Sequence, residues 1–305
     1  MTLKERVCVL YGGTSDERAI SIRSGKAILS ALSASGVNAY GLDTRKHVRS
    51  ELKRNRPDCA FIAVHGSGGE DGSIQRVLQN LKIPYVGSNS RSSLRAFNKI
   101  KAKNIFQKRK VPTPRWLVVS GKKLSNQLEL IKLPAVIKPA TNGSSIGIKM
   151  VQRKDSLLQN LRSSVARYGS VIVEEKIIGR EFTVGILGGK ALPVIELKPK
   201  RFFYDYKAKY TKGLTEYLVP APIDRKLTKQ IQKVALKAHS ALGLRDYSRV
   251  DILMDQRNRL FVLEANSIPG FTETSLLPKA AQAAGISFNQ LCLRLISFAR
   301  GRKSK

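Results

Sequence analysis

The chain has 305 residues, of which 42% are hydrophobic, enough for more than one hydrophobic core, so we expect two or three subdomains. Its formal net charge is +33, and such a field attracts polyanions. The basic residues are spread along the whole chain without an aromatic-interleaved module, so no specific nucleic-acid partner is expected. No apolar run approaches the roughly 20 residues of a membrane span, and the first one is too short for a signal peptide.

The three cysteines, Cys8, Cys59 and Cys292, lie far apart in the sequence. Their spacing is typical of neither a disulfide framework nor a zinc site. We therefore predict buried thiols in a reducing compartment and a cytoplasmic protein.

The first third of the chain predicts strands that alternate with helices. Apolar runs predict strands at residues 7–11, 38–42, 59–64 and 84–86, and helices are predicted at 17–34 and 74–81. This alternation is typical of a parallel sheet covered by helices on both faces. Ligands bind at the carboxyl ends of such strands, where the polar or glycine-rich segments 12–15, 65–72 and 87–90 fall.

The rest of the chain predicts two further units. The second unit has a helix over 92–108, a stiff connector at 111–114, strands at 116–119, 135–138 and 171–175, and a helix over 155–168. The third has strands at 181–187 and 191–197, a helix over 224–242 and a C-terminal helix after Ser287. The polar and aromatic segment 200–219 is long for a simple connection and has little aliphatic content, so we predict a lid over a site.

Residues 250–266 predict a β-hairpin with polar side chains on one face. We expect an even-length turn over 255–258, which places Asp251, Glu264 and Asn266 on the same face because side chains alternate along each strand. Two carboxylates on an apolar strand pair would repel each other and be costly to desolvate. A divalent cation removes that cost, and oxygen ligands without His or Cys favour Mg²⁺ or Mn²⁺.

A second polar motif follows the strand that ends at Lys138. The loop over 139–148 is rich in Gly and Ser, including Ser144 and Ser145. Backbone N–H groups and hydroxyls of such a loop can approach phosphate oxygens beside the lysine. No Gly-Lys-Ser/Thr follows at Walker A spacing, which excludes P-loop chemistry.

The phosphate loop after a Val-Ile-Lys-Pro strand, together with the Arg-x-Asp and Glu-x-Asn elements of the hairpin, resembles the ATP-grasp superfamily. Within it, the chain is most similar to the D-alanine–D-alanine ligases over about residues 6–297, with motifs at 12–18, 65–72, 204–210 and 263–270. The resemblance implies an α/β fold, with an N-terminal parallel α/β (pre-ATP-grasp) domain over 1–94 and a two-subdomain ATP-grasp fold over 95–305. Its central ATP-binding subdomain would span 95–178 and its C-terminal metal and catalytic subdomain 179–305.

The resemblance also implies a reaction. The carboxylate of one D-alanine attacks ATP to give an acyl phosphate. The amine of a second D-alanine displaces the phosphate, so that ADP, phosphate and the peptidoglycan precursor D-alanyl-D-alanine are released. Two Mg²⁺ or Mn²⁺ ions would be held by Asp251, Glu264 and Asn266. ATP would be bound by Lys99, Lys138, Ser144, Ser145, Glu174, Glu175, Lys176, Ile177 and Glu181.

Four residues are implied at the two substrates. Glu17 would anchor the ammonium group of the first D-alanine, with His65 nearby. Ser275 and Leu276 would lie at the carboxylate of the second D-alanine.

Further residues are implied in catalysis. Arg249 and the backbone N–H of Gly270 would stabilise the tetrahedral intermediate, which is usually the largest catalytic term. Lys209 would meet the transferred phosphoryl group. Tyr210 would join Ser144 and Glu17 in a hydrogen-bond network over the site of the second D-alanine. The predicted catalytic set is therefore Glu17, Ser144, Lys209, Tyr210, Arg249 and Gly270.

Two alternatives remain open from the sequence. A close one is a ligase that joins D-alanine to D-lactate or D-serine, and the Lys209-Tyr210 pair favours the dipeptide type instead. The other is a nucleic-acid-binding or surface-binding protein, suggested by the charge, which would bind with a steep salt dependence. The complete catalytic set argues against it. The resemblance further suggests a homodimer.

Overall fold

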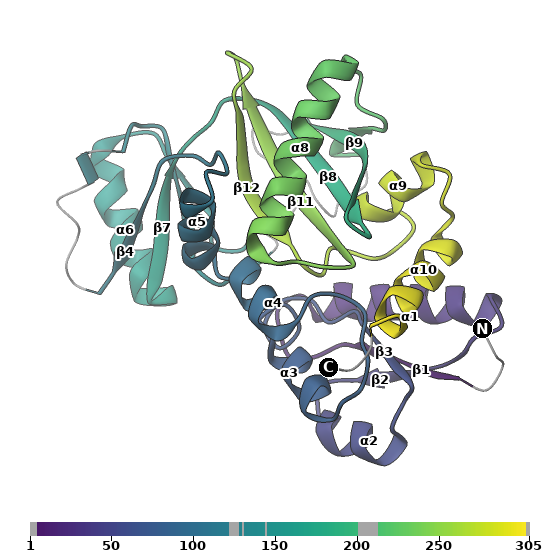
Figure 1. The fold of residues 1–305 in the computed structure, drawn as a ribbon. Helices are drawn as coiled ribbons and strands as arrows, with labels where there is room; N and C mark the ends of the chain where they lie inside the picture. The colour runs from purple at the N-terminus through teal and green to yellow at the C-terminus, as the bar shows by residue number, and fades with distance from the viewer. Residues whose placement is uncertain (1–4, 122–127, 130, 144, 201–212, 303–305) are drawn as a thin grey trace.

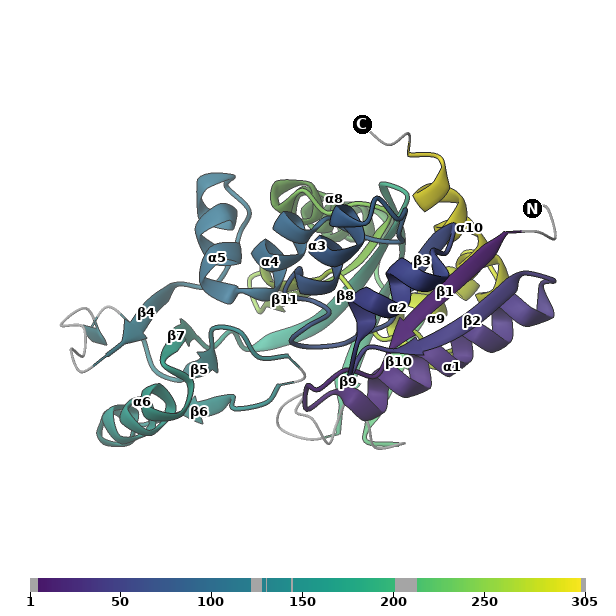
Figure 2. The same cartoon turned by 90° about the horizontal axis from the view of Figure 1, so that it is seen from below.

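Three separate sheets, each with its own helices, make up the protein in the computed structural model (Figures 1 and 2), which describes residues 5–121, 128–129, 131–143, 145–200 and 213–302. One sheet is parallel and the other two are antiparallel. The predicted mixed α/β class is therefore confirmed.

The N-terminal sheet has the order β2-β1-β3 and is parallel throughout. The predicted strand at 84–86 is only a single bridge, in which Tyr85 pairs with Ala60. One helix, α2, was not predicted, because its charged sequence buries only Leu52 and so lacks an apolar period. The elements of this unit are β1 (Arg6–Tyr11), α1 (Arg18–Ala34), β2 (Asn38–Asp43), α2 (Val48–Asn55), β3 (Cys59–Ile62) and α3 (Ser73–Asn80).

The single helix predicted over 92–108 is wrong, since the structure has two helices, α4 (Ser90–Phe97) and α5 (Lys99–Lys108). The break falls at Asn98, whose backbone is extended and whose side chain accepts a hydrogen bond from the N–H of Lys101. An Asn in this role starts a new helix. The N–H of Lys99 donates to the carbonyl of Ala140 at 2.8 Å, which brings α5 against the phosphate loop.

The central sheet is antiparallel, in the order β4-β7-β5-β6, and among the described residues one helix packs on it. Along each of its strands, side chains buried under α6 alternate with side chains on the opposite face of the sheet. Its elements are β4 (Trp116–Ser120), β5 (Ala135–Pro139), β6 (Lys149–Val151), α6 (Lys154–Tyr168) and β7 (Ser170–Glu175).

The described part of the third sheet has five antiparallel strands in the order β10-β9-β8-β11-β12, and α8 lies across one face of it (Figure 1). Val184, Val250 and Ile252 pack in the core beneath α8, so Thr183, Arg249 and Asp251 lie on the opposite face. Within the segment predicted as a loop, residues 215–218 form β10, and residues 201–212 lie outside the described residues. The elements are β8 (Gly179–Leu187), β9 (Lys190–Pro199), β10 (Thr215–Leu218), α8 (Arg225–Leu242), β11 (Tyr247–Asp255) and β12 (Leu260–Asn266).

The β11–β12 hairpin gathers its polar residues on one face, but not for the predicted reason. Met254 lies opposite Leu260, so the connection between them has an odd number of residues. If this register continued unchanged along the hairpin, the side chain of Glu264 would point to the face that α8 covers. A β-bulge, in which Leu263 is the extra residue, shifts the register so that Asp251 lies opposite Glu264. The predicted even-length turn is wrong, and the bulge restores the predicted face.

The C-terminal helices α9 (Leu276–Ala283) and α10 (Phe288–Arg300) return the chain to the N-terminal unit, where α10 lies beside α1 (Figure 1). Phe271 packs between Phe61 of β3 and Tyr247 of β11, with ring centroids 5.4 and 5.8 Å apart. The chain around Phe271 is thereby fixed between the two units. All three cysteines are buried free thiols, as predicted. In the described ranges, no helix combines the length and apolar character that crossing a membrane requires.

Candidate active site

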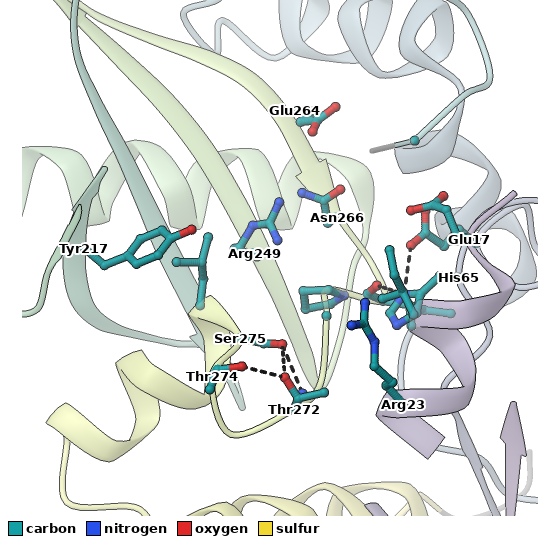
Figure 3. A pocket seen from close by; sticks show the side chains of 17 residues that line it. Glu17, Arg23, His65, Tyr217, Arg249, Glu264, Asn266, Thr272, Thr274 and Ser275 are labelled. Carbon is teal, nitrogen blue, oxygen red and sulfur yellow. Dashed lines mark hydrogen bonds and ion pairs between the residues drawn. The ribbon is translucent and has the colours of Figure 1, made fainter. Parts of the chain in front are cut away.

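A cavity of about 340 Å³ lies where the first and third sheets meet, and we call it the substrate cavity (Figure 3). Side chains from α1 and from the end of β3 line one side, and side chains from β11, β12 and the loop before α9 line the other. The cavity therefore needs both units. The predicted residues that line it are Glu17, His65, Arg249, Glu264, Asn266, Gly270, Ser275 and Leu276.

Glu17 reaches the substrate cavity from the start of α1 and is only 8% exposed. The phosphate loop passes close to it, because a Cβ atom added at Gly143 would lie 2.6 Å from Glu17 Oε2. A larger residue at position 143 would therefore displace the carboxylate. Ser144, which was predicted to join Glu17 in a hydrogen-bond network, lies outside the described residues.

Both ring nitrogens of His65 have partners, and the side chain is buried. Nδ1 lies 3.1 Å from the carbonyl oxygen of Ile268, which can only accept, so Nδ1 carries the proton. Nε2 lies 3.1 Å from Ser24 Oγ, which accepts from the N–H of Phe271 at 3.3 Å. His65 and Ser24 together hold the 268–271 loop that carries Gly270.

Glu70 also lines the substrate cavity, although the sequence motifs predict no role for it. It follows the Gly-rich turn after β3, and its Oε1 lies 3.6 Å from His65 Nδ1. Burial raises the pKa of Glu70 to about 7, with Glu17 and Glu264 acting in the same direction and His65 opposing them. The glycine-rich motif was the available signal, but it did not distinguish this carboxylate from Asp71.

Glu70→Gln is expected to change how the stability of the protein depends on pH. Because the folded-state pKa is raised, Glu70 stabilises the fold below about pH 4.5, and this contribution is lost as the pH rises through about 7. Between pH 5 and pH 8, the variant should gain on the order of 2 kcal/mol of unfolding free energy relative to wild type. Urea unfolding of both proteins at the two pH values measures the difference. If the free energy of unfolding changed equally in the two proteins between these pH values, the prediction would be contradicted.

A second cavity, of about 600 Å³, lies between the central and third sheets, and we call it the nucleotide cavity. Apolar side chains such as Val136, Met150 and Leu263 line it beside the charged ones, a mixture typical of pockets for a planar ring with polar edges. Glu264 lines both cavities. The predicted residues found here are Lys138, Ser145, Glu174, Glu175, Lys176, Ile177, Glu181, Asp251 and Glu264.

Glu174 forms buried ion pairs with two lysines at the nucleotide cavity. Its carboxylate oxygens lie 2.6 Å from Lys138 Nζ and 2.6 Å from Lys103 Nζ. Burial raises the pKa of Glu174, but the two ammonium groups outweigh it and hold that pKa at about 2. Burial lowers the pKa of Lys103 to about 8, against the opposing effect of Glu174. The cluster therefore carries one net positive charge near neutral pH, which suits an anionic nucleotide.

Asp251 and Asn266 lie at the edge between the two cavities. Arg249 donates to Asp251 through two nitrogens at 2.9 and 2.8 Å, Thr183 donates at 2.7 Å, and the Asn266 amide lies 3.3 Å from Asp251 Oδ2. Lys99 Nζ lies 3.9 Å from Glu264 Oε2 and donates to the carbonyl of Asn142 at 2.6 Å. Every predicted site residue among those described therefore lies at one of the two cavities or contacts a residue that does.

The side chains of Asp251, Glu264 and Asn266 together suit a divalent cation. Asp251 lies opposite Glu264 in the β11–β12 ladder, so both carboxylates share a face. In the described ranges, no three His, Cys, Asp or Glu side chains cluster as a metal site, so a cation here would need the amide oxygen of Asn266 beside the two carboxylates. Oxygen ligands of this kind suit Mg²⁺ or Mn²⁺.

The start of α9 closes the far side of the substrate cavity. Ser275 is the N-cap residue, and its hydroxyl accepts from the N–H of Thr272 at 3.1 Å. The first N–H groups of a helix attract carboxylates. Thr272, like Arg23, Tyr217 and Thr274, was not predicted, because no spacing in the sequence relates these residues to the site. Lys209 and Tyr210 lie outside the described residues.

Two antiparallel sheets with a nucleotide-sized cavity between them, and oxygen ligands at its edge, define a protein of the ATP-grasp class. The family model described as "D-ala D-ala ligase N-terminus" matches residues 39–88, and the model described as "D-ala D-ala ligase C-terminus" matches residues 105–297. The chain belongs to the D-alanine–D-alanine ligase family, as its resemblance predicted.

Relatives and solved structures agree with this placement. The chain is 46% identical to a D-alanine–D-alanine ligase of Methylacidiphilum infernorum, over 96% of this chain and 95% of that protein. It is 42% identical to the ligase of Aquifex aeolicus, over 96% and 100% of the two chains. The structure of the Bacillus anthracis ligase complexed with ATP superimposes with a TM-score of 0.86 at 33% identity, covering 97% of this chain and 96% of that chain.

Proposed function

We propose that this protein joins two D-alanines into D-alanyl-D-alanine, with ATP as co-substrate and ADP and phosphate as products. The observation that carries the proposal is that Glu264 lines both cavities, so a molecule in one lies next to a molecule in the other. The D-alanine–D-alanine ligase relatives support the same substrates. The product would serve as a precursor for peptidoglycan.

The first D-alanine would bind on the Glu17 side of the substrate cavity. The buried carboxylate of Glu17 suits its ammonium group, and His65 holds the 268–271 loop in place beside it. The substrate carboxylate would then face the edge shared with the nucleotide cavity. Attack of this carboxylate oxygen on the γ-phosphorus breaks the bond to the β-phosphate oxygen, which gives an acyl phosphate and ADP.

Lys138, Lys99 and the loop with Ser145 would bind the phosphates of ATP. The cluster of Lys103, Glu174 and Lys138 supplies a buried positive charge at that place. Segment 174–177 and Glu181 would bind the adenine and the ribose. Asp251, Glu264 and Asn266 would hold two Mg²⁺ or Mn²⁺ ions, which, when bound, neutralise charge on the transferring phosphoryl group.

The second D-alanine would lie near α9, with its carboxylate at the N–H groups that follow Ser275. Its amine attacks the acyl carbon, loses a proton, and displaces phosphate. Arg249 and the N–H of Gly270 would stabilise the oxyanion of the tetrahedral intermediate. We further propose that Lys209 and Tyr210 cover this site and that Tyr210 favours an amine over a hydroxyl as the attacking group.

We also propose a cellular location and an oligomeric state for the enzyme. The buried free thiols are compatible with a reducing compartment, which supports a cytoplasmic location. Family membership supports a homodimer.

The choice of second substrate separates this proposal from a ligase that makes D-alanyl-D-lactate. Phosphate release is measured near neutral pH with ATP, Mg²⁺ and D-alanine, alone or with D-lactate in excess, and the products are separated by mass. The dipeptide should dominate in both mixtures. A preference for the D-lactate product would overturn the assignment of the second substrate and leave the ATP chemistry intact.

A further inference from the structure

Lys103 contributes charge to the proposed phosphate site but is not among the residues proposed to touch a substrate, and its side chain is only 1% exposed. Burying an ammonium group is costly unless it is paired. It lies on α5 one turn after Lys99, so both side chains leave the same side of the helix.

The contacts of Lys103 connect two parts of the site. Its Nζ lies 2.6 Å from Glu174 Oε1 and donates to Thr113 Oγ1 at 2.5 Å. Lysine can only donate, so the Thr113 oxygen accepts and its own proton goes to the carbonyl of Val262, 2.7 Å away. The direction of each hydrogen bond is therefore fixed.

Val262 is held by the connector before β4 at both of its backbone groups. Its carbonyl accepts from Thr113, and its N–H donates to the carbonyl of Pro112 at 2.8 Å. The next residue, Leu263, is the bulge that turns Glu264 toward the site. A strand anchored immediately before its bulge has a fixed starting point for the shift in register.

We propose that Lys103 is a positioning residue that sets Glu174 and Lys138 in the nucleotide cavity and, through Thr113 and Val262, sets the bulge that presents Glu264. The inference deepens the proposed function and rests on it. One buried ammonium group thereby couples the nucleobase side of the site to its metal side.

The proposed positioning role of the Lys103 side chain is tested by the variant Lys103→Met, with Lys101→Met as the matched control. Lys101 lies on the same helix and is exposed, so its loss changes net charge equally without touching the site. Lys103→Met should weaken ADP binding, measured by calorimetry without D-alanine, at least tenfold. The KM for ATP should rise in parallel, with the KM for D-alanine within about twofold of wild type. Lys101→Met should match wild type throughout.

The link to Val262 is tested separately by Thr113→Val, which removes one hydroxyl at nearly constant volume. This variant keeps the Lys103–Glu174 pair, so its ADP affinity should stay within about threefold of wild type. The Mg²⁺ concentration that gives half-maximal activity should rise at least threefold. The variant does not leave a buried charge unpaired, so it is informative even if Lys103→Met fails to fold.

Equal ADP affinities for wild type, Lys101→Met and a normally melting Lys103→Met would overturn the nucleotide half of the proposal. An unchanged Mg²⁺ dependence in Thr113→Val would overturn the metal half. Failure of the proposed function is distinguishable from both, because a wild-type protein that binds ADP but consumes no ATP with D-alanine refutes the ligase and still allows the comparison of ADP affinities.

Discussion

Glu264→Ala is expected to abolish ADP release in the presence of D-alanine, with a loss of at least about 10³-fold in kcat. Glu264 lines both cavities, lies opposite Asp251 across the ladder and lies near Lys99. Its removal therefore takes one of two carboxylates from the proposed metal site and one carboxylate from beside the Lys99 ammonium group. A coupled assay of ADP at saturating ATP, Mg²⁺ and D-alanine measures the effect.

The matched control is Asp155→Asn, on the exposed first turn of α6, where Asp155 forms an ion pair with the exposed Arg153. The side chain of Glu264 is 32% exposed, so its loss should leave the melting temperature near that of wild type. Loss of activity with normal melting then reports on chemistry and not on folding. ADP release at the wild-type rate from Glu264→Ala would show that the metal assignment is wrong.

Arg249→Met is expected to lower kcat by about 10²–10³-fold, the typical cost of removing one group that stabilises an oxyanion. Arg249 lines the substrate cavity from the face of β11 opposite α8. It also holds Asp251 by two hydrogen bonds, so the variant leaves a largely buried carboxylate with weaker compensation. Steady-state kinetics should place the loss in kcat, with little change in the KM for ATP.

Arg259→Met is the matched control for this experiment. Arg259 lies on the same hairpin and forms an ion pair of similar length, 2.7 Å, with Asp255, but it is exposed. Exposed pairs of this kind contribute little to stability, so the control should keep wild-type kinetics. If both arginine variants retained kcat within threefold of wild type, Arg249 would have no role in the transition state.

The fold could be predicted from the sequence where apolar periodicity was long and uninterrupted. The alternating strands and helices of the N-terminal unit and the β8–β9 and β11–β12 pairs are examples. It could not be predicted where a single polar residue redirects the backbone. Asn98 divides one apolar period into α4 and α5 by capping the second helix, and helix periodicity alone contains no sign of the division.

The site could be predicted largely through motifs, which locate residues in the sequence but not in space. The hairpin illustrates the limit, because the predicted face was reached only through the bulge at Leu263, and bulges have no clear sequence signature. Lys103 illustrates another limit. Its spacing from Lys99 was visible in the sequence. The role that we propose for it depends on Glu174, 71 residues away, and, through Thr113, on Val262, 159 residues away, which only the fold brings together.

The positive charge of the chain remains largely separate from the site. The ion pairs that line the two cavities use only a few of the 55 Lys and Arg residues. Most of the excess charge is therefore a property of the surface.

The central claim is most directly tested with D-alanine labelled with ¹⁸O in both carboxylate oxygens, incubated with the protein, ATP and Mg²⁺. Mass spectrometry should find one D-alanyl-D-alanine and one phosphate for each ADP. Each phosphate should carry one labelled oxygen, because that oxygen bridges carbon and phosphorus in the acyl phosphate. ADP formed without the dipeptide, or dipeptide formed with unlabelled phosphate, would contradict the account.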